Sequence, residues 1–213
     1  SLVDISAVKT DTDWFDEALT SHKSAAGLII GDNGMELLIL TEHEKVKDGD
    51  LKVRFYDHTE AAGTLKKYDS NTGLAVVSVN LSDVDSSTRE VISYAELGSS
   101  KSLRSGQPVI VVGNPTGSNG SLLFGNLTSV MQTAELYDSS YNILTTDILR
   151  SSNGSGVVAD WSGKIIGLLQ EKTEVEGQDN TIQAYGISDV KDLIEHLSNN
   201  QDIVYMGIVG ADV

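Results

Sequence analysis

The sequence has 213 residues, of which 39% are hydrophobic and two are prolines, so it has the composition of an ordered globular chain. Its formal net charge of -16 argues against nucleic acid and anionic membrane surfaces as partners, because both would repel it. The absence of cysteine excludes a disulfide framework, a thiolate zinc site and a cysteine nucleophile.

Short apolar runs separated by turn residues follow one another along the chain. The first pair, "AAGLIIGDNGMELLILT", surrounds Asp32-Asn33-Gly34 and predicts a hairpin, because Asn-Gly accepts positive φ angles. "LKVRFYDH" alternates apolar and polar residues from Leu51, as a half-buried strand does. Further runs are "GTLKKYDSNTGLAVVSVN", "GQPVIVVGNPTG", "SLLFGNLTSVMQTAEL", "NILTTDIL", "GVVADWSGKIIGLLQEK" and "TIQAYGIS". Regular short strands of this kind predict a barrel or a sandwich.

One segment, Ser188 to Leu197, has helical periodicity. Val190, Leu193, Ile194 and Leu197 recur at i, i+3, i+4 and i+7, and Ser188 is a suitable N-cap. Between the two groups of strands, the long polar stretch "SDVDSSTREVISYAELGSSKSLRSG" predicts a connection, with a boundary near residue 100.

The order and spacing of these runs resemble the protease domain of the HtrA/DegP-like serine proteases. The resemblance covers almost the whole chain and includes "GQPVIVVGNP", "GNLTSV", "TTD", "SGKIIGL" and "AYGISDVKDLIEHL". It implies an all-β fold of two packed antiparallel six-stranded β-barrels, the trypsin-like serine protease fold, with a C-terminal helix. The implied organisation is an N-terminal segment (1–24), a first barrel (25–100), a second barrel with the helix (101–198), and a linker entering a PDZ domain (199–213).

The resemblance implies a site made of a serine nucleophile, a histidine base and a buried carboxylate, with backbone N–H groups for the oxyanion. The family carries Asp-Leu-Ala-Val at the start of a strand, whereas this sequence has Gly73-Leu74-Ala75-Val76. Gly73 therefore occupies the position of the triad carboxylate. Asp69, four residues earlier, is more simply a turn residue.

The position of the base has two alignments. The family pattern Thr-x-x-His-Val-Val, counted forward from Thr41, places the base at Glu44. Counted backward from "LKVRF", it places the base at His43. Both remain open from the sequence, as does the simpler interpretation of His43 as a surface histidine.

The position of the nucleophile also has two possible alignments. The family motif Gly-Asn-Ser-Gly-Gly, counted forward from "TTD", matches Ser155, and counted backward from Gly163 it matches Gly154. With Ser155 as the match, one glycine of the motif is missing and another is replaced by Asn153. Asn153, Gly154 and Gly156 then form the expected oxyanion region, with displaced donors.

Departures at all three triad positions on a retained scaffold indicate a pseudoprotease that binds peptides or unfolded proteins or serves in assembly. The alternative is a trypsin-like serine endopeptidase of protein quality control that uses Ser155 and His43. We expect no cofactor and no metal, since His22, His58 and His196 lack metal-ligand spacing. The resemblance further implies a bacterial cell-envelope protein, secreted or membrane-anchored, as a homotrimer or with an active paralogue.

Overall fold

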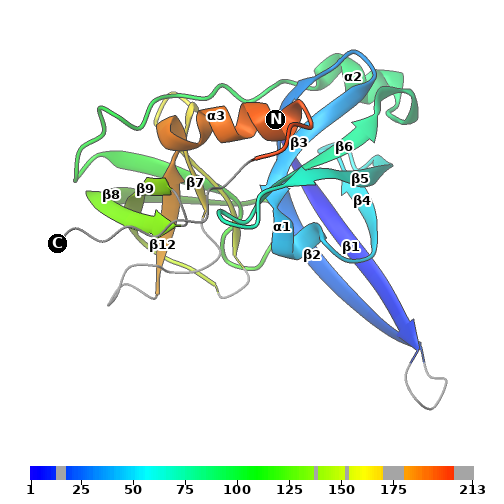
Figure 1. Ribbon diagram of the computed structural model, residues 1–213, viewed down its shortest axis with the longest axis horizontal. Helices are drawn as coiled ribbons and strands as arrows, with labels where there is room; N and C mark the ends of the chain where they lie inside the picture. Colours follow the sequence, from blue (N-terminus) through cyan, green and yellow to red (C-terminus); the bar gives the residue numbers. More distant parts are fainter. Residues whose placement is uncertain (13–17, 137–138, 152–153, 170–179, 204–213) are drawn as a thin grey trace.

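The structure is a computed structural model that describes residues 1–12, 18–136, 139–151, 154–169 and 180–203, and twelve strands lie within these ranges. They form two closed barrels of six strands each, packed side by side (Figure 1). In the first barrel the strand order is β1-β2-β3-β6-β5-β4, and in the second it is β10-β11-β12-β9-β8-β7, with antiparallel pairing in both. The predicted fold class is confirmed.

The strands of the first barrel are β1 (Leu2–Thr12), β2 (Ala18–Asp32), β3 (Glu36–Glu42), β4 (Asp50–Arg54), β5 (Glu60–Tyr68) and β6 (Leu74–Asn80). Those of the second are β7 (Pro108–Asn114), β8 (Ser121–Leu136), β9 (Ser139–Leu149), β10 (Ser155–Ala159), β11 (Ile165–Leu169) and β12 (Thr181–Gly186). The helices are α1 (His43–Val46), α2 (Ser86–Val91) and α3 (Ile187–Ser198), with a 3-10 turn at Leu81–Asp83. None of the helices in the described ranges is long and apolar enough to cross a membrane.

The predicted hairpin at Asp32-Asn33-Gly34 joins β2 to β3. Gly34 has a φ of +87°, and the Asn33 side chain accepts hydrogen bonds from the backbone N–H groups of Met35 and Glu36. Local turn chemistry therefore fixes this corner of the barrel. The first barrel already begins at Leu2, so the boundary expected at residue 25 falls inside β2.

Alternation along the strands divides the apolar side chains among three cores. One fills the first barrel and another fills the second, as illustrated by Ile39 and Val111. The third lies between the barrels, where Leu40 of β3 and Val157 of β10 belong to the same buried cluster. Because neighbouring strand residues point to opposite faces, Ile39 faces the barrel interior while Leu40 faces the other barrel.

Helix α3 covers the core between the barrels with one apolar face (Figure 1). Its buried residues are Ile187, Val190, Leu193, Ile194 and Leu197. The helix begins one residue earlier than predicted, and the N-cap is Gly186 rather than Ser188. The predicted cap is wrong because the Ser188 hydroxyl has another partner: it accepts a hydrogen bond from the backbone N–H of Ser100, and the Ser188 N–H donates to the Ser100 hydroxyl.

Candidate functional site

Two of the predicted site residues, His43 and Gly73, lie directly beside each other. His43 opens α1 at the end of β3, and its backbone N–H donates a hydrogen bond of 2.7 Å to the Gly73 carbonyl oxygen. The imidazole stacks on the Tyr68 ring, with the ring centroids 3.8 Å apart and the planes 5° from parallel. Sequence reasoning missed this aromatic contact, because Tyr68 ends a different strand, β5.

Gly73 lies at the tight turn before β6, with a φ of +74°. A Cβ built at this residue would have no atom within 4 Å, so the position that the resemblance assigns to a carboxylate is open. Asp69 lies in the same turn and belongs to its hydrogen-bond network. Its carboxylate accepts hydrogen bonds from the Thr72 N–H and hydroxyl and from the Asn71 N–H, which close the turn, as the sequence predicted.

Glu44, the other candidate for the base, pairs with a neighbouring cation. Its carboxylate oxygens lie 2.7 and 2.8 Å from the Lys47 ammonium, and its side chain is 44% exposed. The Lys47 hydrogen bond lowers the pKa of the Glu44 carboxyl below its ordinary value. A lowered pKa makes Glu44 a weaker proton acceptor near neutral pH, where a general base functions best.

Ser155 is fully buried at the first position of β10. Its Oγ accepts a hydrogen bond of 2.9 Å from the backbone N–H of Ala26 on β2. The carbonyl oxygen of Ala26 in turn accepts a hydrogen bond of 3.0 Å from the Thr41 hydroxyl. Ser155 therefore joins the two barrels, and its hydroxyl is shielded from the solvent through which a substrate carbonyl would approach.

The loop before Ser155 leaves no room for a nucleophile at the alternative position. A Cβ at Gly154 would lie 2.4 Å from the Pro115 carbonyl oxygen, so a serine there requires the backbone to move. The Gly154 N–H donates to the Ser151 carbonyl oxygen at 2.9 Å and is already engaged within the loop. Gly156 lies within β10 at a φ of +142°, and Asn153 lies outside the described residues.

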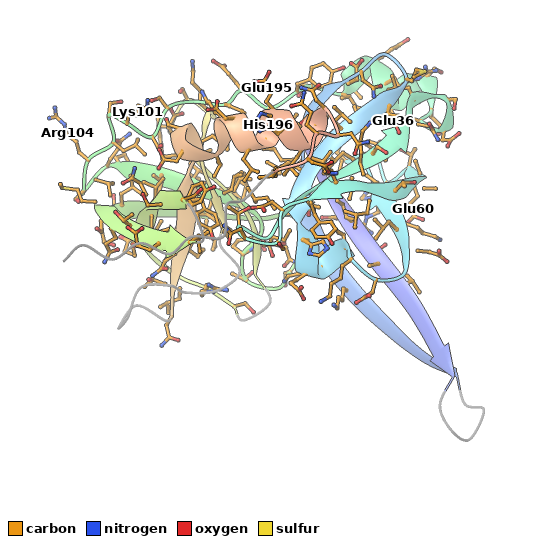
Figure 2. The ribbon with its side chains drawn as sticks, in the orientation of Figure 1. Glu36, Glu60, Lys101, Arg104, Glu195 and His196 are labelled. Atoms are coloured by element: carbon orange, nitrogen blue, oxygen red, sulfur yellow. The ribbon has the colours of Figure 1, made fainter. Side chains whose placement is uncertain are left out.

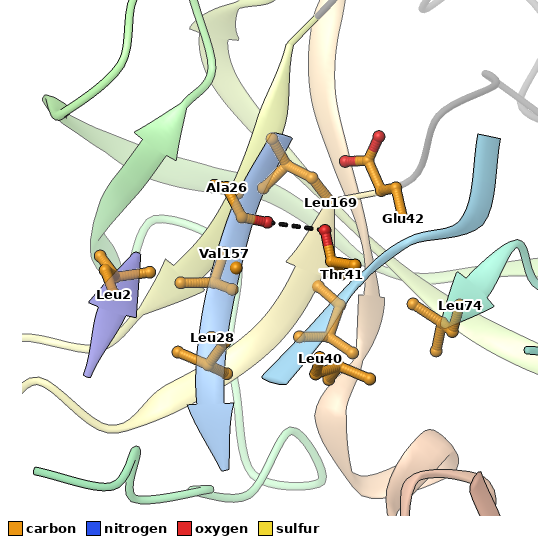
Figure 3. A pocket seen from close by; sticks show the side chains of 12 residues that line it. Leu2, Ala26, Leu28, Leu40, Thr41, Glu42, Leu74, Val157 and Leu169 are labelled. Carbon is orange, nitrogen blue, oxygen red and sulfur yellow. Dashed lines mark hydrogen bonds between the residues drawn. The ribbon is translucent and has the colours of Figure 1, made fainter. Parts of the chain in front are cut away.

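A cavity of about 20 Å³ lies between the barrels beside these residues. Its lining includes Ala26, Thr41, Glu42, Val157 and Leu169 (Figure 3). Such a volume accepts one water molecule and is far too small for a peptide side chain. The closed seam between the barrels therefore offers no ready-made substrate pocket at this point.

Glu42 is a buried acidic residue that sequence reasoning missed. Its side chain is 8% exposed, and the Lys45 ammonium lies 4.0 Å from one carboxylate oxygen. The sequence signal is a charged residue two positions after the apolar run "LLIL". Glu42 therefore places a carboxylate in the lining of the cavity between the barrels. It does not occupy any of the three positions that the resemblance assigns to the triad.

Gln183 is a second buried polar residue that the sequence did not single out. It is 1% exposed on β12, and among the described residues neither its amide oxygen nor its amide nitrogen has a hydrogen-bond partner. It pairs across the sheet with Thr145, whose hydroxyl donates instead to Gln132. The strand register places Gln183 and Ser155 on the face of the second barrel that also carries Tyr185 and Val157. This face turns toward the first barrel.

Among the residues that the structure describes, no cluster of three His, Asp or Glu side chains could hold a metal ion. The groups brought together are thus His43, Tyr68 and Gly73 on the first barrel, and a Ser155 hydroxyl bonded to Ala26 at the seam. In this arrangement, no described hydrogen bond links Ser155 to His43.

Comparison with known proteins identifies the domain family of the chain. A family model for the trypsin-like peptidase domain matches residues 25–168. The chain is 29% identical over 204 residues to "Serine protease Do-like HtrA" of Bacillus subtilis, covering 91% of this chain and 44% of that protein. It is 26% identical over 191 residues to "Serine protease HtrA-like" of Staphylococcus aureus, covering 84% of this chain and 24% of that protein. The chain therefore spans less than half the length of these relatives.

Solved structures share the fold. Two structures of the HtrA-type protease AlgW with a decapeptide superpose with TM-scores of 0.72 and 0.67, at 17% and 18% identity. Each superposition covers 93% of this chain, and the two cover 63% and 64% of the respective AlgW chains. The matched domain, the paired barrels and the HtrA relatives agree with one another, and this chain belongs to the trypsin-like peptidase domain family, in which it is similar to the HtrA proteases.

Proposed function

We propose that this chain is a catalytically inactive HtrA-like domain, a pseudoprotease that binds peptide or unfolded protein segments or serves in assembly. The observation that carries the proposal is the Ser155 hydroxyl, which is buried and bonded to Ala26 instead of facing a base. Gly73, at the carboxylate position, removes the group that would orient the imidazole. In a serine protease with a complete triad, replacing the aspartate alone lowers kcat by about 10⁴.

The proposal extends to the ligand and the location of the protein. A decapeptide accompanies AlgW in its solved structures, and an extended peptide is the ligand class proposed for this chain. A homotrimer or a mixed assembly with an active paralogue is the proposed setting, in a bacterial cell envelope. Residues 199–213 are proposed to lead into a PDZ domain, and most of this segment, 204–213, lies outside the described residues.

Two assays test the absence of catalysis. The chain is incubated with unfolded casein and, separately, with a fluorophosphonate probe that labels activated serines. We expect neither turnover nor labelling above the level of the Ser155→Ala variant. Casein turnover that disappears in Ser155→Ala would show an active protease and overturn the proposal.

A weak endopeptidase that uses Ser155 and His43 is the second candidate. It is favoured by the close approach of His43 to Gly73, which keeps the histidine at the turn where the family places its triad. For this candidate, peptide binding would have to draw the Ser155 hydroxyl away from Ala26. Fluorophosphonate labelling in the presence of a peptide, but not in its absence, would support it over the first proposal.

A further inference from the structure

A groove on the second barrel combines apolar surface with two cations. It has a volume of about 420 Å³, and its apolar lining comes from Leu103, Val130 and Met131. Its cations, Lys101 and Arg104, belong to the connection that precedes β7. Figure 2 shows these two residues together at the end of the molecule that lies away from the first barrel. A volume of this size lies within the range of ligand pockets in proteins.

A β-bulge shapes the apolar side of the groove. Between Ser129 and Gln132 the pairing of β8 with β9 shifts its register, and Val130 and Met131 lie within this irregular segment. A bulge interrupts the alternation of faces along a strand and redirects its side chains. Val130 packs against the core of the second barrel, whereas Met131 is 89% exposed. Because an unbranched methionine adapts to the shape of its partner, this exposed side chain is a suitable apolar contact for a ligand.

The segment that carries the cations is held in place near both of its ends. Near its start, the Ser188 hydroxyl accepts a hydrogen bond of 2.8 Å from the Ser100 N–H, and the Ser100 hydroxyl accepts one of 3.1 Å from the Ser188 N–H. Near its end, the Gly106 N–H donates a hydrogen bond of 2.6 Å to the Leu127 carbonyl oxygen. The groove is therefore formed before a ligand arrives, which lowers the entropic cost of binding.

The two cations of the groove are exposed and available. Among the residues that the structure describes, neither Lys101 nor Arg104 has a carboxylate oxygen within 4.0 Å of its side-chain nitrogens. The groove also contains Asp189, whose carboxylate accepts hydrogen bonds from the backbone and side-chain N–H groups of Asn142. In a chain with 31 acidic and 15 basic residues, this pair of cations is a local site of positive charge on an acidic protein.

From this combination of charge and apolar surface, we infer that the groove binds a short, extended peptide segment with one apolar side chain between acidic residues. The apolar side chain covers Met131 and Leu103. The flanking carboxylates pair with Lys101 and Arg104, and a guanidinium can hold a carboxylate through two parallel hydrogen bonds that fix its orientation. The inference rests on the proposed peptide-binding role, for which it names a ligand class, and it requires nothing of the Ser155 region.

Fluorescence anisotropy with a synthetic peptide tests the inference. The probe is fluorescein-labelled Gly-Asp-Glu-Phe-Asp-Glu-Gly, and the uncharged Gly-Asn-Gln-Phe-Asn-Gln-Gly is its comparison. We expect the unmodified chain to bind the acidic probe with saturation and to bind the uncharged peptide at least about tenfold more weakly, because the carboxylates are absent. In Lys101→Glu/Arg104→Glu we expect the affinity for the acidic probe to fall at least about tenfold, because two attractions become repulsions.

A matched control reverses one lysine and one arginine on the first barrel. Lys52→Glu/Arg89→Glu alters exposed residues of β4 and α2 and changes the net charge by the same amount. We expect this variant to bind the acidic probe like the unmodified chain. Lys101→Gln/Arg104→Gln introduces no repulsion, and its affinity is expected to lie between those of the unmodified chain and the charge reversal. Circular dichroism and urea unfolding establish that each variant is folded.

A double-mutant comparison tests the apolar contact. Replacing the phenylalanine of the acidic probe with alanine is expected to weaken its binding to the unmodified chain by about fivefold. The same replacement is expected to make little difference to Met131→Ser, which lacks the apolar partner. Coupling between the two changes would locate the phenylalanine on the methionine.

Several results would overturn the inference. They are failure of the unmodified chain to bind the acidic probe, affinity that survives the Lys101→Glu/Arg104→Glu reversal, and preference for the uncharged peptide. Binding that ignores the phenylalanine and is displaced by inorganic phosphate would indicate a simple anion site and would also refute it. Casein turnover that disappears in Ser155→Ala would instead overturn the proposed absence of catalysis, and it would leave the anisotropy result in place.

Discussion

The Ser155 hydroxyl accepts a hydrogen bond from the backbone N–H of Ala26, 129 residues away in the chain, and this bond crosses from the second barrel to the first. In a serine protease of this family the corresponding loop presents a nucleophile. In this chain Ser155, at the end of that loop, links the two barrels instead. Its structural role can therefore be tested by measuring the free energy of unfolding.

We predict that Ser155→Ala destabilises the protein without loss of any hydrolytic activity. The substitution leaves the buried Ala26 N–H without its acceptor, which costs about 1–3 kcal/mol. Urea unfolding followed by circular dichroism measures the change, and Ser82→Ala, at an exposed serine, is the matched control. An unfolding free energy equal to that of the control variant would contradict the barrel-joining role.

We predict that restoring a carboxylate at residue 73 does not restore catalysis. The position has room for a side chain, but its φ of +74° makes Gly73→Asp unfavourable by about 1 kcal/mol. The restored carboxylate would still lack an exposed serine, so casein turnover is expected to stay at background. Gly73→Asn carries the same backbone cost without the charge and serves as control. Turnover in the Asp variant alone would indicate that Ser155 can reach His43.

We predict that Gln183→Leu stabilises the protein. The buried amide of Gln183 has no hydrogen-bond partner in the part of the chain that the structure describes, and leaving such a group unsatisfied costs about 1–3 kcal/mol. Leucine has a similar size and removes that cost, so the thermal midpoint is expected to rise. Gln183→Glu is the opposite control, because a carboxylate at this position would be buried. A clear destabilisation by leucine would mean that the amide is satisfied in solution.

We predict that Thr88 links stability to pH through Asp57. The hydroxyls of Thr88 and Thr59 donate to the Asp57 carboxylate, and they lower its pKa below the ordinary value of 3.8. Because the folded pKa is depressed, the stabilisation is present above the unfolded pKa and is lost as pH falls through the folded pKa. The stability difference between the unmodified chain and Thr88→Val is expected to be largest at neutral pH and to shrink below about pH 4.

Unfolding free energies from pH 7 to pH 2 measure this difference. Thr116→Val, at an exposed threonine of the loop after β7, provides a control whose stability difference stays constant with pH. A pH-independent difference for Thr88→Val as well would show that Asp57 does not carry the linkage.

Local patterns determined much of this protein from the sequence alone. Alternation, turn residues and helical periodicity predicted the strands, the hairpin at Asn33-Gly34 and helix α3, because each depends on residues close together in the chain. The sequence also predicted that Gly73 stands where the family carries its aspartate. This assignment needed only the strand motif Leu74-Ala75-Val76, which directly follows Gly73.

The tertiary structure decided what the side chains of the site do. Two alignments left the nucleophile position open between Ser155 and Gly154, and the structure shows one hydroxyl bonded to Ala26 and the other position blocked by Pro115. Sequence reasoning also did not predict that His43 stacks on Tyr68 or that the amide of Gln183 is buried. The physical reason is that hydrogen-bond partners and steric room depend on the register between distant strands and on the packing of one barrel against the other, which no local pattern encodes.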